Sequence, residues 1–175
     1  FPTRRSSDLY KEGVIDYMIE EYKKGRTPNP DVMCNKEIKF GLFYEWAMNN
    51  GFDFIATGHY AKINELNGRQ FISKATDLKK DQSYVLWGLQ QDLLSRTILP
   101  LGKLRKSRIR EMAVEYGYPE LAKKSESYEI CFVPDNDYRG FLKRRVSGLE
   151  ERLEGGHFVD KEGRILGKHK GYPFY

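Results

Sequence analysis

The sequence predicts an α/β fold in which helices pack on a sheet with parallel strands. Apolar residues recur at helical spacing in two early segments, a short apolar strand follows the second of them, and another helix comes after a predicted β-hairpin. Helices and strands that alternate in this way typically form layers around parallel strands. Ligands of such folds bind at the carboxyl ends of strands, so functional residues are expected there.

The first helix is expected over residues 12–24. Its apolar side chains fall three or four positions apart, and Gly25 provides a stop. Residues 25–31 are expected to form a loop, because Pro28 and Pro30 each lack the backbone N–H that the interior of a helix needs.

A second helix and a strand follow this loop. Asn35 can cap a helix that extends to about Asn50, since its side chain can accept a bond from a first-turn N–H. Residues 52–57 then predict a short buried strand. Gly58 and His59 come directly after it, at the strand end where a ligand is expected.

The rest of the chain is expected to alternate between short strands and helices. A hairpin is expected about Asn67-Gly68, with strands near residues 60–65 and 70–75, and a short helix opened by Asp81 or Ser83 should then reach Trp87. A helix from Lys106 to Tyr116 and a strand over residues 130–133 are expected next. The last expected elements are a helix near residues 138–146, capped by Asp135 or Asp137, and strand-like segments from Gly155 onward.

The composition is that of a globular chain with a basic surplus. Its 175 residues are 39% hydrophobic, and 30 Lys and Arg against 25 Asp and Glu give a net charge of +5. A basic surplus favours a polyanionic partner such as nucleic acid. Neither an apolar run of about 18 residues nor a secretory signal is seen, and the chain has two cysteines, so a reducing, cytoplasmic location is expected.

Cys34 is the first candidate for chemistry. It lies between the Pro-rich loop and Asn35, and therefore at or near an expected helix N-terminus. The helix dipole and the nearby Lys36 and Lys39 would stabilise a thiolate there. Asp31 lies three residues earlier and can take a proton, although its charge opposes a thiolate. The other interpretation is a small cysteine that fills space in the core.

Three further groups are weaker candidates by themselves. Cys131 lies in an apolar strand, where a core role is the simpler interpretation. Gly58-His59 offers close backbone approach and a polar ring, but it also suits a tight turn. The polar cluster at residues 79–84 can hold phosphate and contact a base edge, or it can be a solvated turn.

Four strings taken together resemble the tRNA-specific 2-thiouridylase family over residues 10–175. They are Gly-Arg-Thr-Pro-Asn-Pro-Asp-Val-Met-Cys-Asn-Lys-Glu-Ile-Lys-Phe at residues 25–40, Ala-Thr-Gly-His-Tyr-Ala at 56–61, Lys-Asp-Gln-Ser-Tyr at 80–84 and Ser-Tyr-Glu-Ile-Cys-Phe-Val at 127–133. The resemblance implies a Rossmann-like sheet of the adenine nucleotide alpha hydrolase type. It also implies an ATP pyrophosphatase that adenylates the C2 oxygen of the wobble uridine of tRNA and then replaces that oxygen with sulfur.

The resemblance also implies roles for individual residues. Cys131 matches the cysteine that carries a persulfide, and Cys34 matches the one that attacks it to give a disulfide and release sulfur to the base. Asp31 matches a proposed acid/base, and Gly58 matches an ATP contact. ATP would act with Mg²⁺, which neutralises phosphate charge, and no residue of the chain is expected to bind a metal directly.

The implied partners are tRNA and a sulfur-donor protein, either a cysteine desulfurase or a sulfur relay protein. Residues 29–31, Asn-Pro-Asp, match the segment that meets the target base. The tRNA contacts are expected to be Asn29, Pro30, Asp31, His59, Lys80, Asp81 and Gln82. A loop stiffened by two prolines loses little entropy when it grips a flipped base, and a persulfide needs a second thiol to cleave it.

The domain organisation expected from this resemblance has three parts. Residues 1–9 resemble the translation of a sequencing adapter and are interpreted as an artefactual leader, the alternative being a genuine basic leader. Residues 10–136 are expected to be the C-terminal part of the ATP-pyrophosphatase domain, and residues 137–175 the start of a small α+β central tRNA-binding domain. A Ser-Gly-Gly-rich ATP loop is not present in the sequence, so the chain by itself is expected to be inactive.

Two other functions stay open from the sequence. One is another thiolating ATP pyrophosphatase, such as a 4-thiouridine or cytidine thiolase, against which the Pro-rich string and the lack of CxxC pairs count. The other is a basic tRNA-binding module without chemistry.

Overall fold

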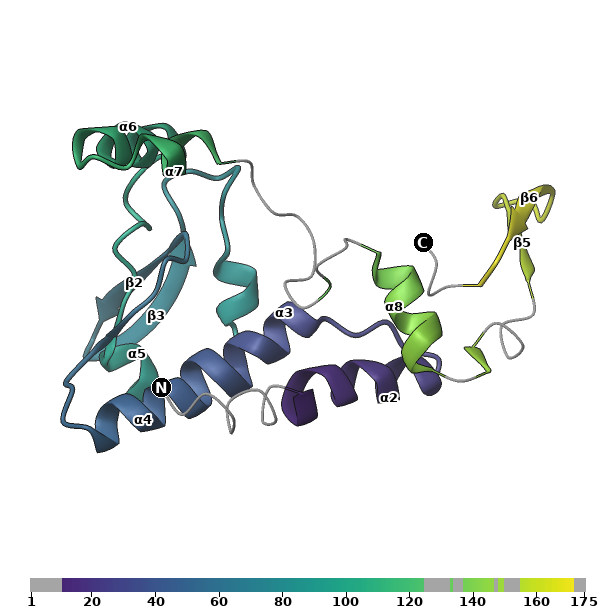
Figure 1. Cartoon of the computed structure of the whole chain (residues 1–175), viewed down its shortest axis with the longest axis horizontal. Helices are drawn as coiled ribbons and strands as arrows, with labels where there is room; N and C mark the ends of the chain where they lie inside the picture. Colours follow the sequence, from purple (N-terminus) through teal and green to yellow (C-terminus); the bar gives the residue numbers. More distant parts are fainter. Residues whose placement is uncertain (1–10, 125–132, 134–136, 147, 150–154, 172–175) are drawn as a thin grey trace. The chain divides into compact units, whose positions relative to one another are not determined.

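The computed structural model describes residues 11–124, 133, 137–146, 148, 149 and 155–171 (Figure 1). The chain divides into two compact units. Residues 31–126 form the central unit, and residues 1–30 with 127–175 form the terminal unit. Within the described residues, no helix is long and apolar enough to cross a membrane. This division does not test the domain boundary expected after residue 136, which stays a prediction.

A long helical run opens the central unit. It comprises α3 (Pro30–Met33), the π-helix η2 (Cys34–Leu42) and α4 (Phe43–Asn49), which continue one another in Figure 1. Pro30 suits the first helical position, because its missing N–H is not needed there and its φ is already helical. The helix therefore begins five residues before Asn35, and the expectation that Asn35 caps it is wrong. Asn35 is instead buried within the run.

The end of this run explains why the expected strand is shorter than residues 52–57. The N–H of Gly51 bonds to Met48 O at 3.2 Å and the N–H of Phe52 to Ala47 O at 3.1 Å, while Gly51 has φ +81°. This is a Schellman ending, which favours a contact between the residue after the glycine and the last turns of the helix. The Phe52 ring accordingly stacks on Trp46 at 5.9 Å between centroids. Phe52 thus finishes the helix instead of starting a strand.

The expectation of parallel strands is confirmed, but the pair that forms is short. Strand β1 (Ile55–Ala56) pairs in parallel with β4 (Thr97–Ile98), and Ile55 is buried while Phe54 is 55% exposed. An antiparallel hairpin of β2 (Ala61–Leu66) and β3 (Arg69–Lys74) follows β1. Its turn at Asn67 and Gly68 has φ +53° and +73°, as a two-residue type I′ turn requires.

Short helices complete the central unit. They are the 3-10 helix η3 (Ser83–Leu86) and the α-helices α5 (Gln91–Ser95), α6 (Lys106–Glu115) and α7 (Pro119–Lys123). The helices η3 and α6 match the expectations, whereas α5, α7 and β4 were not foreseen. The core of this unit contains Phe40, Ala47, Ile55, Ala61, Val85 and Leu86. It joins η2 and α4 to β1, β2 and η3.

The terminal unit is held by a second core. The π-helix η1 (Lys11–Asp16) leads into α2 (Tyr17–Lys23), which confirms the helix expected over residues 12–24. The expected basic helix is α8 (Tyr138–Arg145), and Asp137 caps it by accepting a bond from Gly140 N at 2.8 Å. The core contains Met18, Ile19, Tyr22, Val133, Phe141, Leu142, Val146 and Leu149.

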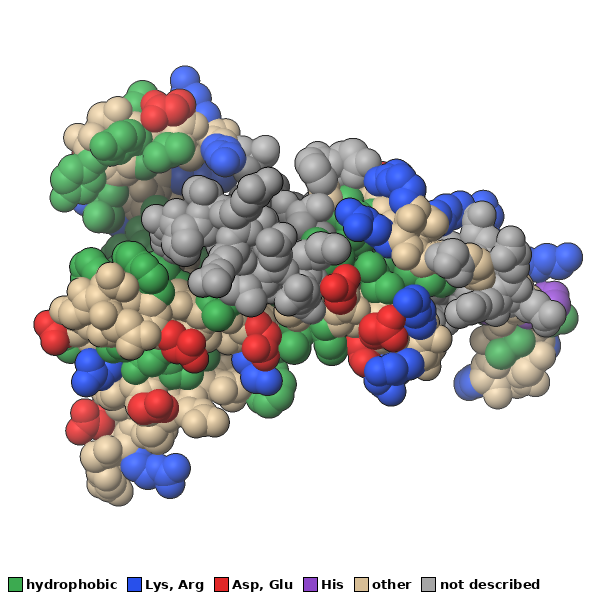
Figure 2. Space-filling model, turned by 60° about the horizontal axis from the view of Figure 1, so that its bottom comes forward, with side chains coloured by type: hydrophobic (Ala, Val, Ile, Leu, Met, Phe, Trp, Pro, Cys, Tyr) green, Lys and Arg blue, Asp and Glu red, His purple; other side chains and the backbone are tan. Residues whose placement is uncertain are grey.

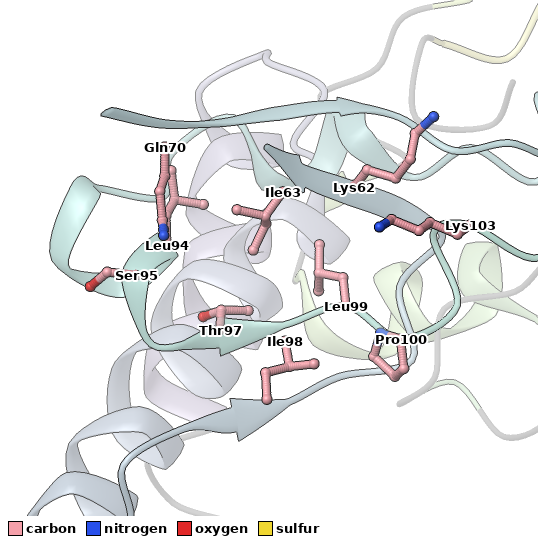
Figure 3. Close-up of a pocket in the computed structure, with 10 residues that line it drawn as sticks. All are labelled: Lys62, Ile63, Gln70, Leu94, Ser95, Thr97, Ile98, Leu99, Pro100 and Lys103. Atoms are coloured by element: carbon pink, nitrogen blue, oxygen red, sulfur yellow. The ribbon is translucent and has the colours of Figure 1, made fainter. Parts of the chain in front are cut away.

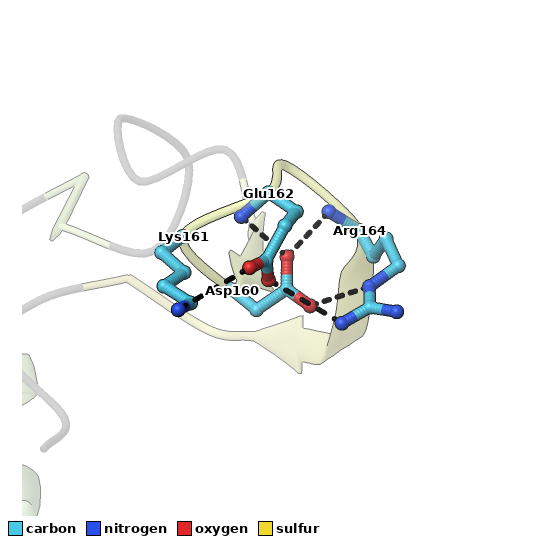
Figure 4. A network of polar contacts seen from close by, with 4 residues as sticks. All are labelled: Asp160, Lys161, Glu162 and Arg164. Carbon is cyan, nitrogen blue, oxygen red and sulfur yellow. Dashed lines mark hydrogen bonds and ion pairs between the residues drawn. The ribbon is translucent and has the colours of Figure 1, made fainter.

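A small hairpin of β5 (Gly156–Val159) and β6 (Ile165–His169) also belongs to the terminal unit. Asp160 organises its loop, as Figure 4 shows: its carboxylate accepts bonds from Glu162 N at 3.0 Å, Arg164 N at 2.9 Å and Arg164 Nε at 2.7 Å. These donors, the Arg164 backbone first, lower the pKa of Asp160. The loop is therefore closed by a single carboxylate.

Gly102 allows a close backbone approach in the central unit. A Cβ added to it would lie 1.8 Å from the carbonyl oxygen of Ala61, which begins β2. The Gly102 carbonyl also accepts a bond from Thr76 N at 2.9 Å, just after β3. The segment that follows β4 can therefore reach the hairpin only because residue 102 has no side chain.

Replacing Gly102 with alanine should lower the free energy of unfolding of the central unit by about 2 kcal/mol or more, because the backbone must shift to make room. Gly88→Ala is the matched control, since a Cβ there meets nothing within 4 Å, and it should change stability by less than about 0.5 kcal/mol. Both tryptophans, Trp46 and Trp87, lie in this unit. Urea unfolding followed by tryptophan fluorescence therefore measures it, and equal midpoints for the two variants would contradict the argument.

Candidate functional site

Three of the four sequence strings meet in the central unit. The Phe40 ring of η2 packs against the His59 ring at the end of β1, with 5.9 Å between centroids. Phe40 also shares the core with Val85 and Leu86 of η3, which follow the Lys-Asp-Gln string. The helical run that carries Cys34, the strand end that carries Gly58, and the turn before η3 are thus parts of one packed structure.

His59 is a buried, neutral base at this junction. Only 6% of it is exposed, and its Nδ1 lies 2.8 Å from Thr57 Oγ1. Burial, and to a smaller extent the positive charge of Lys39, lower the pKa of His59 to about 4. The ring is therefore uncharged at neutral pH. A contact of His59 with RNA, which stays a prediction, would be a neutral hydrogen bond and not a charge interaction.

Asp81 and Gln82 hold the turn between the hairpin and η3. The carboxylate of Asp81 accepts bonds from Ala75 N and Ser83 Oγ, both at 2.7 Å. Gln82 bonds Tyr60 twice: its N–H donates to Tyr60 O at 2.8 Å, and its Oε1 accepts from Tyr60 N at 3.0 Å. Both side chains thus stabilise the fold, a role that the sequence did not indicate.

The same turn carries two lysines next to Asp81 and Gln82. Lys79 is exposed and Lys80 is half-buried, while Asp77 fixes the backbone here by accepting bonds from Lys79 N at 3.3 Å and Lys106 N at 3.0 Å. Acidic and basic side chains alternate over much of the face in Figure 2. An RNA contact of the turn before η3 would therefore depend on local groups such as Lys79 and Lys80.

Cys34 lies one turn inside the helical run and is half-buried. Cys34 was expected in the first turn of a helix, but that turn contains Asp31, which is exposed. This corrects the sequence argument, since the N–H groups left open by a helix are those of its first turn. Cys34 is instead the first residue of a π-helix, a rare geometry that is frequent at functional sites.

Asn35, next to Cys34, is the functional candidate that the sequence argument misjudged. It is 4% exposed, and its Oδ1 has no hydrogen-bond partner in the part of the chain that the structure describes. A buried polar atom without a partner is uncommon and needs an explanation. The residue following the candidate nucleophile therefore has a buried acceptor whose partner is not among the described residues.

Gly58 is exposed at the carboxyl end of β1. Its φ is not positive, and a Cβ would make only an ordinary contact of 3.8 Å with Leu101 Cδ1. The fold itself therefore does not require glycine here, whereas a ligand that approaches the backbone would benefit from it. This geometry fits a nucleotide contact.

The remaining candidates are placed only in part. Asn29 is exposed and Pro30 begins α3. A strand was expected over residues 130–133, and its residues 130–132, with Cys131, lie outside the described residues. Val133 belongs to the core of the terminal unit. The approach of Cys34 and Cys131 stays a prediction. Among the described residues, no group of three or more His, Cys, Asp or Glu side chains could hold a metal ion.

A parallel strand pair covered by helices, with an open glycine at its carboxyl end, is typical of nucleotide-binding α/β domains. Residues 3–135 match the family described as the tRNA methyl transferase HUP domain. The chain belongs to this family, and the expected adenine nucleotide alpha hydrolase type of fold is confirmed.

The curated relatives are tRNA-specific 2-thiouridylases. The chain is 59% identical over 162 residues to the one from Cytophaga hutchinsonii, which is 93% of this chain and 44% of that protein. It is 57% identical over 162 residues to the one from Amoebophilus asiaticus, with 93% and 43% covered. For Salinibacter ruber the values are 50% over 168 residues, with 95% and 44% covered. The chain thus spans less than half the length of these relatives.

The buried His59 should make the central unit less stable in mild acid. Its folded pKa of about 4 lies below the unfolded value near 6.5, so the unfolded state binds the proton first as the pH falls. Stability should drop between about pH 6.5 and about pH 4, by up to about 3 kcal/mol from this residue. Urea midpoints measured across this range should fall less for His59→Gln than for the wild type.

The exposed His157 in β5 provides the control, and His157→Gln should keep the wild-type pH profile. Carboxylates titrate in the same range, so the comparison is between variants and not between single curves. Identical profiles for His59→Gln and the wild type would show that burial of this ring does not control its protonation.

Proposed function

We propose that the protein takes part in the ATP-dependent 2-thiolation of the wobble uridine of tRNA. The observation that carries the proposal is the 59% identity, over 93% of this chain, to a tRNA-specific 2-thiouridylase. The name of the matched family mentions methyl transfer, but the relatives are named as 2-thiouridylases. The chain also has the two cysteines that sulfur transfer through a persulfide needs.

The first half of the proposed reaction activates the base. ATP is a substrate that adenylates the C2 oxygen of the uridine and so makes it a good leaving group, with Mg²⁺ neutralising the phosphates. Gly58 is the proposed ATP contact, and its open backbone at the end of β1 supports this role. Asp31, exposed in the first turn of α3, is the proposed acid/base.

The second half of the reaction delivers sulfur. A persulfide on Cys131 would attack C2 through its outer sulfur, and AMP would leave with the original oxygen. The Cys34 thiolate would then attack the inner sulfur of Cys131, so that a disulfide forms, the S–S bond of the persulfide breaks and the outer sulfur stays on the base. A reductant must reopen the disulfide before the next cycle, and a sulfur-donor protein must reload Cys131.

The substrate contacts proposed for tRNA are Asn29, Pro30 and Asp31 at the target base, and His59, Lys80, Asp81 and Gln82 along the RNA. The bonds made by Asp81 and Gln82 support a positioning task, since they fix the turn that presents Lys79 and Lys80. A tRNA substrate is also the reason to propose the cytoplasm as the place of action.

The function can be tested with a chimera. Residues of this chain replace the matching 162-residue segment in the enzyme of Cytophaga hutchinsonii, and 2-thiouridine in tRNA is measured in cells that lack their own enzyme. The chimera should restore thiolation, because it would carry both cysteines and Gly58. Cys34→Ser and Cys131→Ser should each abolish thiolation but leave AMP–tRNA formation intact, since adenylation does not use a thiol.

A folded chimera that adenylates tRNA and still thiolates with Cys131→Ser would remove Cys131 as the sulfur carrier. A folded chimera that neither adenylates nor thiolates, but binds tRNA as tightly as the parent enzyme, would favour a binding module without chemistry.

The chain itself should bind tRNA with an affinity that falls as salt rises, because phosphate contacts release counterions. Lys79→Gln with Lys80→Gln should reduce the slope of log affinity against log salt by about one for each phosphate that is no longer neutralised. Lys123→Gln with Lys124→Gln removes the same charge from two adjacent exposed lysines at the end of α7 and is the control. Equal slopes for the two double variants would exclude the Lys79–Lys80 turn as an RNA contact.

A further inference from the structure

The pocket between the β2–β3 hairpin and α5 does not form an anion site (Figure 3). It has a volume of about 400 Å³, and its lining includes Lys62 and Lys103. The ammonium group of Lys62 points away from the pocket and from that of Lys103, so the two charges do not meet on one ligand. A surface better suited to a ligand lies on η3, in the same unit.

Two large aromatic rings lie exposed on one edge of η3. Tyr84 is 63% exposed, and Trp87, which ends the helix with φ −59° and ψ −25°, is 76% exposed. Side chains three residues apart in a 3-10 helix eclipse one another, so the two rings share an edge and lie about 6 Å apart along the helix axis. Val85 and Leu86 occupy the other edges and are buried in the core. We call Tyr84 and Trp87 the aromatic strip.

The aromatic strip is held in place by the turn before it and by the core beneath it. Ser83, the first residue of η3, donates its hydroxyl to Asp81 Oδ2 at 2.7 Å. Gln82 is tied to Tyr60 by two hydrogen bonds. On the other side of the helix, Leu86 is only 1% exposed. The strip is therefore formed before a ligand arrives, and binding need not order it.

Positive charge lies directly before the aromatic strip. Lys79 is exposed and Lys80 is half-buried, and the ion pairs within the described part of the chain do not include Lys79. The carboxylates of Asp77 and Asp81 accept bonds from backbone N–H groups of the fold. Cations beside exposed rings suit single-stranded RNA, whose phosphates need positive charge and whose unpaired bases stack on aromatic faces.

We propose that the aromatic strip is a stacking platform for unpaired bases of RNA. The rings of Tyr84 and Trp87 would each stack on a base, and Lys79 and Lys80 would neutralise the phosphates that join these bases. Such a platform is tolerant of sequence, because every base has a face that can stack. A loop of the proposed tRNA substrate would supply the bases, and only this identity of the RNA rests on the proposed function.

The first test uses Trp87 as its own reporter. Trp46→Phe leaves Trp87 as the single tryptophan of the chain. The full chain with this change is titrated with a short single-stranded RNA and with a duplex of the same sequence. A base that stacks on an indole ring quenches its fluorescence, so the single strand should quench Trp87. The duplex should quench it far less, because its bases are already stacked on one another.

The second test removes the rings and measures affinity by the fluorescence anisotropy of labelled RNA. Tyr84→Ala with Trp87→Ala should weaken binding of the single strand about tenfold or more. The slope of log affinity against log salt should not change, since no phosphate contact is lost. Tyr84→Phe with Trp87→Phe keeps both aromatic faces and should retain most of the affinity. Tyr116→Ala with Tyr118→Ala removes two exposed rings between α6 and α7 and is the matched control.

The outcomes separate this inference from the proposed function. Quenching by the single strand, with affinity lost in the Tyr84 and Trp87 alanine variant but kept in the control, supports the platform even when the chimera fails to thiolate tRNA. That failure would count only against the proposed function.

The platform is overturned when the single strand does not bind, binds without quenching Trp87, or binds the folded alanine variant as tightly as the wild type. These results would overturn it even when the chimera thiolates. An alanine variant that keeps its RNA affinity but no longer binds a sulfur-donor protein would also overturn it, and would assign the aromatic strip to a protein partner. Far-UV circular dichroism shows whether each variant is folded.

Discussion

The contact between Phe40 and His59 is the interaction on which the candidate site depends. It fixes the helical run of Cys34 to the end of β1, and Phe40 joins both to η3 through the same core. Since Phe40 follows Cys34 by fewer than two helical turns, its packing also limits where the thiol can lie relative to Gly58. A ring in the core thus positions groups at the surface.

Burial at this junction changes what its polar groups can do. His59 becomes a neutral ring because desolvation opposes its charge. Asp81 and Gln82 bond the backbone of neighbouring segments and make the turn rigid. Asn35 has a buried oxygen, beside the candidate nucleophile, that finds no partner among the described residues. The turn and the helix are therefore shaped by polar groups that face inward.

Local chemistry was enough to predict several elements from the sequence. Asn67-Gly68 gives the hairpin, because both residues accept positive φ, and Asp137 caps α8 as its position suggested. Gly25, Gly51 and Gly117 each end a helix with positive φ. In these cases the residue type and its neighbours decide the structure.

Longer-range effects account for what the sequence argument missed. Phe52 has the apolar side chain of a strand residue, but the preceding helix uses it to complete its ending. Pro30 was interpreted as a helix breaker, although it is favoured at the first helical position. The role of Gly102 depends on Ala61 and Lys62, which are distant from it in sequence. The pairing of the two cysteines involves Cys131, which lies outside the described residues.

The central claim is that Cys34 and Cys131 exchange sulfur within one chain. Since the chain has only these two cysteines, mild oxidation of the purified chain with diamide, followed by peptide mass spectrometry, tests it directly. The account predicts one disulfide-linked pair of peptides, formed within a monomer and reversed by a thiol reductant. A chain in which both thiols stay reduced, or which forms disulfides only between molecules, would contradict it.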